Sequence, residues 1–369
     1  MPTPFIPANA PEAIIRFSKG RGAGNNQVKR FSAYTREQDR DFLDHQEDEG
    51  GPPRPRTVVT PRAARSIISR NASPDLAFSQ SINPYEGCEH GCSYCYARPT
   101  HAYLGLSPGL DFETKIFSKP NAAELLRAEL SRPSYVPSMI ALGANTDPYQ
   151  PIERELQITR QVLQVLAECH LPVAITTKSA LVVRDLDILA PMAAKGLVRV
   201  HVSLGTLDHT LARRMEPRAN SPTKRLEAIA RLAAAQVPVG VFSSPIIPAL
   251  NDAEMESVLK AARDAGASSA SYIILRLPLE VRDIFVQWLH EHYPLKADHV
   301  MNLIRQMRDG QDYDADFRVR MRGTGEFAKM LAHRFKIAAR RLGLNADRAS
   351  MDVSQFRRPS EQTDQLDLF

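Results

Sequence analysis

The sequence contains no apolar run that approaches the about 20 residues needed to cross a bilayer. Its first 30 residues also lack the charged and then apolar pattern of a signal peptide. From these two absences we expect a cytoplasmic protein with no membrane partner. Cysteine is scarce too, with 4 among 369 residues. Such a low number argues against a disulfide framework, and for metal or redox chemistry where cysteines cluster.

The sequence also lacks a strong excess of either charge. It has 47 Lys+Arg against 42 Asp+Glu, a net charge of +5. A polyanionic partner is therefore permitted but not required. Because 43% of the residues are hydrophobic, the chain can bury a large core. We expect one main domain with appendages.

Composition divides the chain into four parts. Residues 1–75 are rich in Gly, Pro, Arg and Asp and cannot bury much apolar surface, so we expect an extended or partly disordered arm. Residues 76–292 alternate short apolar runs with amphipathic stretches. We expect residues 293–344 to form a helical extension, and residues 345–369 to form a flexible polar tail.

Six apolar runs in the central part predict buried strands. They cover residues 76–85, 138–144, 173–178, 198–204, 239–246 and 271–277. The stretches between them carry apolar residues at helical spacing. This alternation predicts an α/β fold with a parallel sheet, and six units favour a partial (β/α)6 barrel over a closed eight-fold one. In such folds the reactive residues collect at the carboxyl ends of the strands.

Three of the four cysteines lie in "GCEHGCSYC", directly after the first predicted strand. Cys88, Cys92 and Cys95 have the spacing C-x3-C-x2-C. When three thiolates hold a cubic 4Fe-4S cluster, one iron stays open to another ligand, as a reactive metal site requires. The alternative is a zinc site completed by His90, although zinc sites usually divide their ligands between two separated pairs.

This cysteine motif, with Tyr94 before its last Cys and six strand-helix units around it, resembles the radical S-adenosylmethionine (SAM) superfamily. The resemblance covers roughly residues 76–292. It implies that the open iron binds the amino and carboxylate groups of SAM. It also implies that an electron, from a donor such as flavodoxin or ferredoxin, cleaves SAM to methionine and a 5'-deoxyadenosyl radical.

Polar residues follow the next three predicted strands. Asn145, Thr146 and Asp147 come after the second, Lys178 ends the third and Ser203 lies near the end of the fourth. Taken singly, each fits an ordinary turn, cap or solvated loop residue. Their joint placement at successive strand ends favours a binding site.

The sequence also resembles the spore photoproduct lyase branch of the superfamily, and bacterial proteins described as DNA repair photolyase-like. That resemblance implies that Thr146, Lys178 and Ser203 hold SAM together with Tyr94. The lyase has a cysteine on its second strand that returns a hydrogen atom to the substrate radical, whereas this chain has Asn145. A lesion-splitting reaction quenched by such a thiol is therefore in doubt.

Three further residues are candidates for the same binding site, at the mouth of the predicted partial barrel. His101, soon after the cysteines, could donate a proton, or it could be a packing histidine. Glu216, Arg218 and Arg225 follow the fourth predicted strand; an arginine here, with Arg225 as the candidate, could pair with the SAM carboxylate, or these residues could form surface salt bridges. Arg276 follows the sixth predicted strand and could contact the substrate. With Tyr94, we take His101 and Arg276 as the candidate catalytic residues.

The chain ends in "QTDQLDLF", whose last five residues resemble the peptide by which bacterial replication and repair proteins bind the sliding DNA clamp. The resemblance implies that Gln365 forms hydrogen bonds and that Leu366, Leu368 and Phe369 fill apolar pockets. The alternative is an inert frayed end. A functional motif here would point to DNA as a partner.

Three hypotheses follow. The first is a radical SAM enzyme that abstracts hydrogen from damaged or modified DNA, for repair or modification. The second keeps this enzyme class and changes the substrate to RNA, a peptide or a metabolite. The third is a non-catalytic protein whose cysteines hold zinc or an iron-sulfur cluster.

Overall fold

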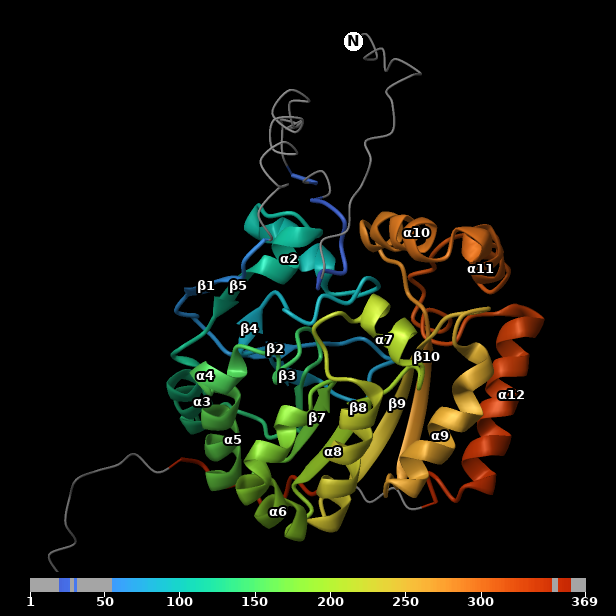
Figure 1. The fold of residues 1–369 in the computed structure, drawn as a ribbon. Coiled ribbons are helices and arrows are strands. Elements are labelled where there is room, and N and C mark those ends of the chain that lie inside the picture. The colour runs from blue at the N-terminus through green and yellow to red at the C-terminus, as the bar shows by residue number, and fades with distance from the viewer. Residues whose placement is uncertain (1–19, 27–29, 32–54, 347–350, 360–369) are drawn as a thin grey trace, which may run out of the picture.

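The computed structural model describes residues 20–26, 30–31, 55–346 and 351–359 of the chain. Figure 1 shows a mixed α/β architecture, with helices packed around a central sheet. The strands are β1 (Val58–Pro61), β2 (Ile68–Arg70), β3 (Gln80–Ile82), β4 (Tyr85–Glu86), β5 (Lys115–Ser118), β6 (Ile140–Leu142), β7 (Val173–Thr177), β8 (Val198–Ser203), β9 (Val239–Ile246) and β10 (Ser269–Ile274).

The longer helices follow the strands in alternation. The α-helices are α2 (Leu110–Thr114), α3 (Ala122–Ser131), α4 (Glu153–Leu156), α5 (Ile158–Glu168), α6 (Leu186–Ala194), α7 (His209–Met215), α8 (Pro222–Ala234), α9 (Met255–Asp264), α10 (Val281–His292), α11 (Ala297–Gln306) and α12 (Gly325–Arg341). Short 3-10 helices cover Arg98–Leu104, Ala180–Asp185, Asp252–Glu254 and Pro294–Lys296.

The main sheet has the order β10-β9-β8-β7-β6-β3-β2. Neighbours from β3 to β10 are parallel, and β2 pairs antiparallel with β3 at one edge. All six predicted strands are therefore present, in chain order across the sheet, which confirms the α/β fold and the partial barrel. They were readable because parallel strands are covered on both faces and form nearly continuous apolar runs.

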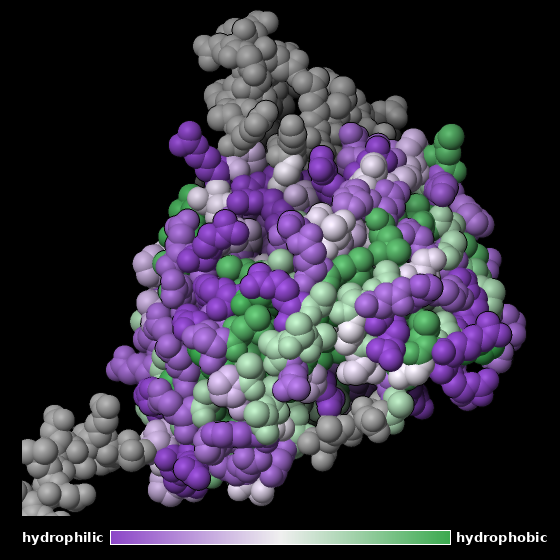
Figure 2. Space-filling view, turned by 60° about the horizontal axis from the view of Figure 1, so that its bottom comes forward, coloured by the Kyte–Doolittle hydropathy of each residue, from purple (hydrophilic) through white to green (hydrophobic). Residues whose placement is uncertain are grey.

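Capping residues and apolar faces fix the surrounding helices. Asp208 accepts hydrogen bonds from two backbone amides at the start of α7, and Ser221 caps α8 with Pro222 in its first turn. α5 buries Val162, Leu163 and other apolar residues against the sheet. Figure 2 views the outer surface with the lower end of Figure 1 turned forward, and shows apolar side chains lying between hydrophilic ones there. No helix among the described residues is long and apolar enough to span a membrane.

The arm and the tail contribute more structure than their composition indicates. β1 and β2 lie before residue 76, and β1 joins β5 and β4 in a second, three-stranded sheet. In the tail, the Arg357 amide donates to the Cys169 carbonyl and Phe356 packs on Tyr135. The predicted helices of the C-terminal extension are present as α11 and α12. The boundaries that we drew between the four parts stay predictions.

Candidate active site

The cysteine loop follows β4 and lies at the carboxyl end of the main sheet. Cys88 and Cys92 are buried, and Cys95 is half-buried. Cys88 packs with Ala97 and Phe112, while Cys95 packs against the apolar groups of both other cysteines. The three cysteines thus share one loop, whereas Cys169 packs in the main core. Within the described residues no three His, Cys, Asp or Glu side chains are arranged to hold a metal ion, so the role of the three cysteines as ligands stays a prediction.

Burial favours the protonated form of two of these thiols, those of Cys92 and Cys95. It raises the pKa of Cys92 well above its ordinary value, although the Lys178 ammonium nearby lowers it. Burial and the neighbouring Cys88 also raise the pKa of Cys95. Such thiols become ligands when a metal ion displaces their protons. Three soft thiol ligands on one loop fit an iron-sulfur cluster with one iron left open.

A group of buried residues supports the loop from the arm and α2; we call Gly22, Ala23, Arg98 and Glu113 the supporting cluster. Arg98 forms a 2.6 Å ion pair with Glu113, and neither side chain is exposed. Arg98 also donates to the Cys92 carbonyl at 2.9 Å. The amides of Gly22 and Ala23 donate to the Glu113 carboxylate at 3.0 and 2.8 Å. The Glu113 carboxylate and the Arg98 guanidinium therefore neutralise each other, and both have hydrogen-bond partners.

The arm approaches the loop too closely for any side chain at residue 22. A Cβ on Gly22 would lie 1.6 Å from the carbonyl oxygen of Gly91. Gly91 itself has φ of 64° and faces the Glu113 carboxylate. Sequence reasoning missed the packing of the arm on this loop, because a glycine-rich arm gives no apolar signal and the Glu113 carboxylate that binds the Gly22 amide is 91 residues away.

The loop after β6 holds the cysteine loop from another direction. Thr146 Oγ1 donates to the Tyr85 carbonyl at 2.8 Å, and Gln150 bonds to the backbone of Gly87 and Glu89. The Asn145 amide donates to Asn83 Oδ1 at 3.1 Å. Asn145 and Thr146, which we predicted as SAM ligands, therefore also have structural partners in this protein.

Asp147 joins three strand ends. It accepts hydrogen bonds from the Thr177 hydroxyl and the Lys178 amide, both at 2.7 Å, and lies 3.3 Å from His90 Nδ1. Burial alone would raise the pKa of Asp147. His90 and these hydrogen bonds lower the pKa by more than burial raises it, and the result is a pKa of about 2. Burial lowers the pKa of His90, but Asp147 and Cys88 raise it to about 10. Asp147 is therefore an anion that fixes the loops on both sides of Lys178.

The predicted cofactor residues on β7 and β8 form a second group; we call Tyr94, Lys178, Ser203, Glu216 and Arg225 the mouth cluster. The Tyr94 hydroxyl donates to Glu216, which also forms a buried ion pair with Arg225. Arg225 donates to the Ser203 carbonyl at 2.9 Å. The Lys178 ammonium lies 5.9 Å from the centre of the Tyr94 ring.

Glu216 organises this group. Burial raises its pKa, but the Arg225 and Lys178 cations reverse the effect, so the pKa of Glu216 is lowered and it is a carboxylate. We expected Arg225 to meet the SAM carboxylate or a surface acid; it meets Glu216, and both side chains are buried. Lys178 Nζ has no hydrogen-bond acceptor within the part of the chain that is described. It is a cation whose hydrogen-bonding capacity is not used up.

The two remaining candidates lie in different surroundings. His101 is fully buried, its Nε2 lies 3.0 Å from the Lys115 carbonyl, and its ring packs on Phe112. Burial lowers its pKa. These contacts favour a packing role for His101, because its ring is directed toward β5 and away from Lys178. Arg276 lies over the ring of Tyr96, 5.1 Å from its centre, a contact that the sequence did not predict.

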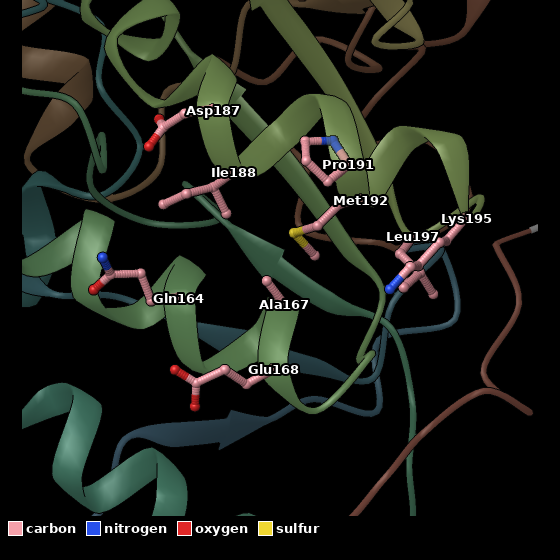
Figure 3. Close-up of a pocket in the computed structure, with 9 residues that line it drawn as sticks. All are labelled: Gln164, Ala167, Glu168, Asp187, Ile188, Pro191, Met192, Lys195 and Leu197. Carbon is pink, nitrogen blue, oxygen red and sulfur yellow. The ribbon is translucent and has the colours of Figure 1, made fainter.

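A separate pocket lies at the other end of the strands. Its volume is about 300 Å³, and Figure 3 shows residues of α5 and α6 around it. Ala167, Ile188, Met192 and Leu197 give it an apolar lining. Leu197 precedes β8, whereas the mouth residues follow the strand ends, so this pocket is not part of the cysteine site.

Comparisons with known proteins give the family. The model described as Radical SAM superfamily matches residues 82–262. An uncharacterised protein of Mycobacterium tuberculosis is 37% identical over 233 residues, which cover 63% of this chain and 68% of that protein. An uncharacterised protein of Methanocaldococcus jannaschii is 26% identical over 221 residues, covering 60% and 79%.

Among solved structures, spore photoproduct lyase complexed with dinucleoside spore photoproduct matches with a TM-score of 0.52 at 16% identity. The match covers 78% of this chain and 80% of that one. A variant of the same lyase with bound AdoMet and dinucleoside spore photoproduct matches equally well. At this identity the likeness shows a shared fold. The family match and the M. tuberculosis relative together show that the chain belongs to the radical SAM superfamily.

Proposed function

We propose that this protein is an enzyme that reductively cleaves SAM at a 4Fe-4S cluster and uses the 5'-deoxyadenosyl radical to abstract hydrogen from DNA. Cys88, Cys92 and Cys95 hold the cluster. When bound, the cluster supplies an electron and an open iron for the amino and carboxylate groups of SAM. The observation that carries the proposal is the set of three thiols on one loop beside the Lys178 ammonium, which has no hydrogen-bond acceptor among the described residues.

The mouth cluster has separate tasks in this proposal. Lys178 offers its ammonium to an anionic group of SAM. The ring of Tyr94 packs on the bound nucleotide. Glu216 holds that ring in place by accepting a hydrogen bond from its hydroxyl group. Glu216 also neutralises Arg225, which leaves Lys178 as the cation for the ligand.

Two features support DNA as the substrate. The lyase with the same fold was solved with a dinucleoside photoproduct. The C-terminal QLDLF resembles a clamp-binding peptide, although residues 365–369 lie outside the described part of the chain. We do not propose that this protein splits the lyase's lesion, because Asn145 stands where the lyase has its hydrogen-donating cysteine on the second strand.

Anaerobic reconstitution tests the enzyme activity. The protein is loaded with iron and sulfide, reduced with dithionite and given SAM, and 5'-deoxyadenosine is measured by chromatography. We expect it from the wild type and from Cys169→Ala, and none from Cys92→Ala. Stoichiometric zinc with no 5'-deoxyadenosine would contradict the proposal and support a non-catalytic metal protein.

A pull-down tests the partner. We expect the bacterial sliding clamp to retain the full chain, and to retain a variant lacking residues 365–369 much less. Equal retention would remove the clamp from the proposal. The electron donor, flavodoxin or ferredoxin, is identified by replacing dithionite with each protein and its reductase.

A further inference from the structure

Arg276 has unusually weak partners for a half-buried guanidinium. Its Nη2 is 3.4 Å from the Tyr313 hydroxyl and its Nη1 is 3.7 Å from the Met321 sulfur. Its Nε is buried without a hydrogen-bond partner. No carboxylate of a described residue lies within ion-pair distance. Since guanidinium groups bind anions through pairs of parallel hydrogen bonds, Arg276 retains capacity for one.

Two arginines of the C-terminal segment, Arg318 and Arg320, are paired with acids. Arg320 forms two hydrogen bonds with Asp75, at 2.6 and 2.7 Å. Arg318 pairs with Asp316 at 2.6 Å. Arg276 differs in this respect from Arg318 and Arg320, whereas Arg308 donates to backbone carbonyls and Arg322 lies over the Tyr272 ring.

Tyr96 places an exposed aromatic ring beside this cation. It follows Cys95 directly, and 44% of the residue is exposed. Its hydroxyl donates to the Ala144 carbonyl, just after β6, while Arg276 follows β10. β6 and β10 are four places apart in the sheet order, so Tyr96 connects distant strand ends. The ring therefore lies across the mouth, next to the cysteines.

We propose that Tyr96, Arg276 and Tyr313 form a nucleotide subsite, in which Arg276 binds a phosphate and a base stacks on Tyr96. This deepens the proposed function and rests on it, since it gives DNA a place next to the SAM site. A guanidinium matches a phosphate in bidentate geometry, and an exposed aromatic ring beside it is the usual platform for an unpaired base. The anchored Tyr96 hydroxyl holds the ring in place for stacking.

Binding of single-stranded DNA to the full chain tests the subsite. The probe is a short fluorescein-labelled oligothymidylate, and fluorescence anisotropy gives the dissociation constant at several salt concentrations. We expect Arg276→Gln to weaken binding about tenfold, and to lower the salt slope by about one, as loss of one phosphate contact should. Tyr96→Ala should weaken binding by about tenfold or more, and Tyr96→Phe, which keeps the ring, much less.

Two controls separate the subsite from general effects. Arg318→Gln removes a cation that is 86% exposed in the same segment and should change binding little. Arg276→Lys keeps the charge without the planar fork, so its binding should fall between wild type and Arg276→Gln. Circular dichroism melting confirms that each variant is folded.

Several results would overturn the subsite. One is equal binding by Arg276→Gln and Arg318→Gln. A second is tighter binding of oligouridylate with the same dependence on Arg276, which would assign the subsite to RNA. A third is loss of SAM binding in Arg276→Gln with DNA binding intact, which would assign the guanidinium to SAM. Because DNA binding is measured without SAM or reductant, failure of wild-type SAM cleavage would instead count against the proposed function.

Discussion

The supporting cluster and the cations at the mouth both contact the cysteine loop, but their charges are met differently. In the supporting cluster, Glu113 accepts hydrogen bonds from Arg98, Gly22 and Ala23, and the ion pair is fully buried. At the mouth, Lys178 and Arg276 lie over tyrosine rings, and neither forms an ion pair with a carboxylate in the part of the chain that the structure describes. The first arrangement is complete and serves folding. The second leaves two cations able to bind ligands.

The largest effect is expected from breaking the supporting cluster. Glu113→Gln removes the carboxylate and leaves the Arg98 guanidinium buried without its counterion. We expect the free energy of unfolding to fall by about 3 to 5 kcal/mol, measured by urea denaturation. In the control Glu227→Gln, the lost ion pair with Lys224 has both side chains more than half exposed, so the change should stay below about 1 kcal/mol. Similar changes in both variants would show that the cluster does not support the fold.

Asp147 gives a smaller, pH-dependent effect. Its pKa of about 2 in the folded protein lies below the ordinary 3.8, so its stabilisation is present above pH 3.8 and is lost as the pH falls toward about 2. We expect Asp147→Asn to lower the free energy of unfolding by about 2 kcal/mol at pH 7. The difference from wild type should shrink at low pH. A difference that is constant with pH would contradict this ionised state.

Lys178 should affect ligand binding and not the fold. Lys178→Met should weaken SAM binding to the reconstituted protein by about tenfold or more, because a charge-assisted contact is lost. The free energy of unfolding should stay close to that of wild type, since no hydrogen bond of the ammonium within the described chain is broken. Equilibrium dialysis with labelled SAM measures the binding, with the exposed Lys224→Met as control. Unchanged SAM binding in Lys178→Met would place SAM elsewhere.

The same contrast explains what the sequence could predict. The six parallel strands and the three cysteines were readable, because apolar runs and ligand spacing are local patterns. The roles of Gly22 and Glu113 were not, since their contact joins segments 91 residues apart and involves a backbone amide. The second sheet was missed because its strands are two to four residues long and β1 is largely exposed.

The mouth residues fall between these cases. Lys178 and Ser203 do lie at strand ends, where parallel strands deliver their residues to one edge, while their role at a SAM site stays a prediction. The choice of partners was not predictable: Arg225 meets Glu216, and Arg276 meets Tyr96. These pairings depend on how loops of different length fold back over the sheet. A single sequence shows which polar groups are available there, but not which of them pair.

The most direct test of the central claim is electron paramagnetic resonance of the reduced, reconstituted protein with and without SAM. A cluster on Cys88, Cys92 and Cys95 with one open iron should give about four irons per chain and a signal that shifts when SAM is added. A cluster signal that SAM leaves unchanged, or a protein that retains zinc and no iron, would contradict the account.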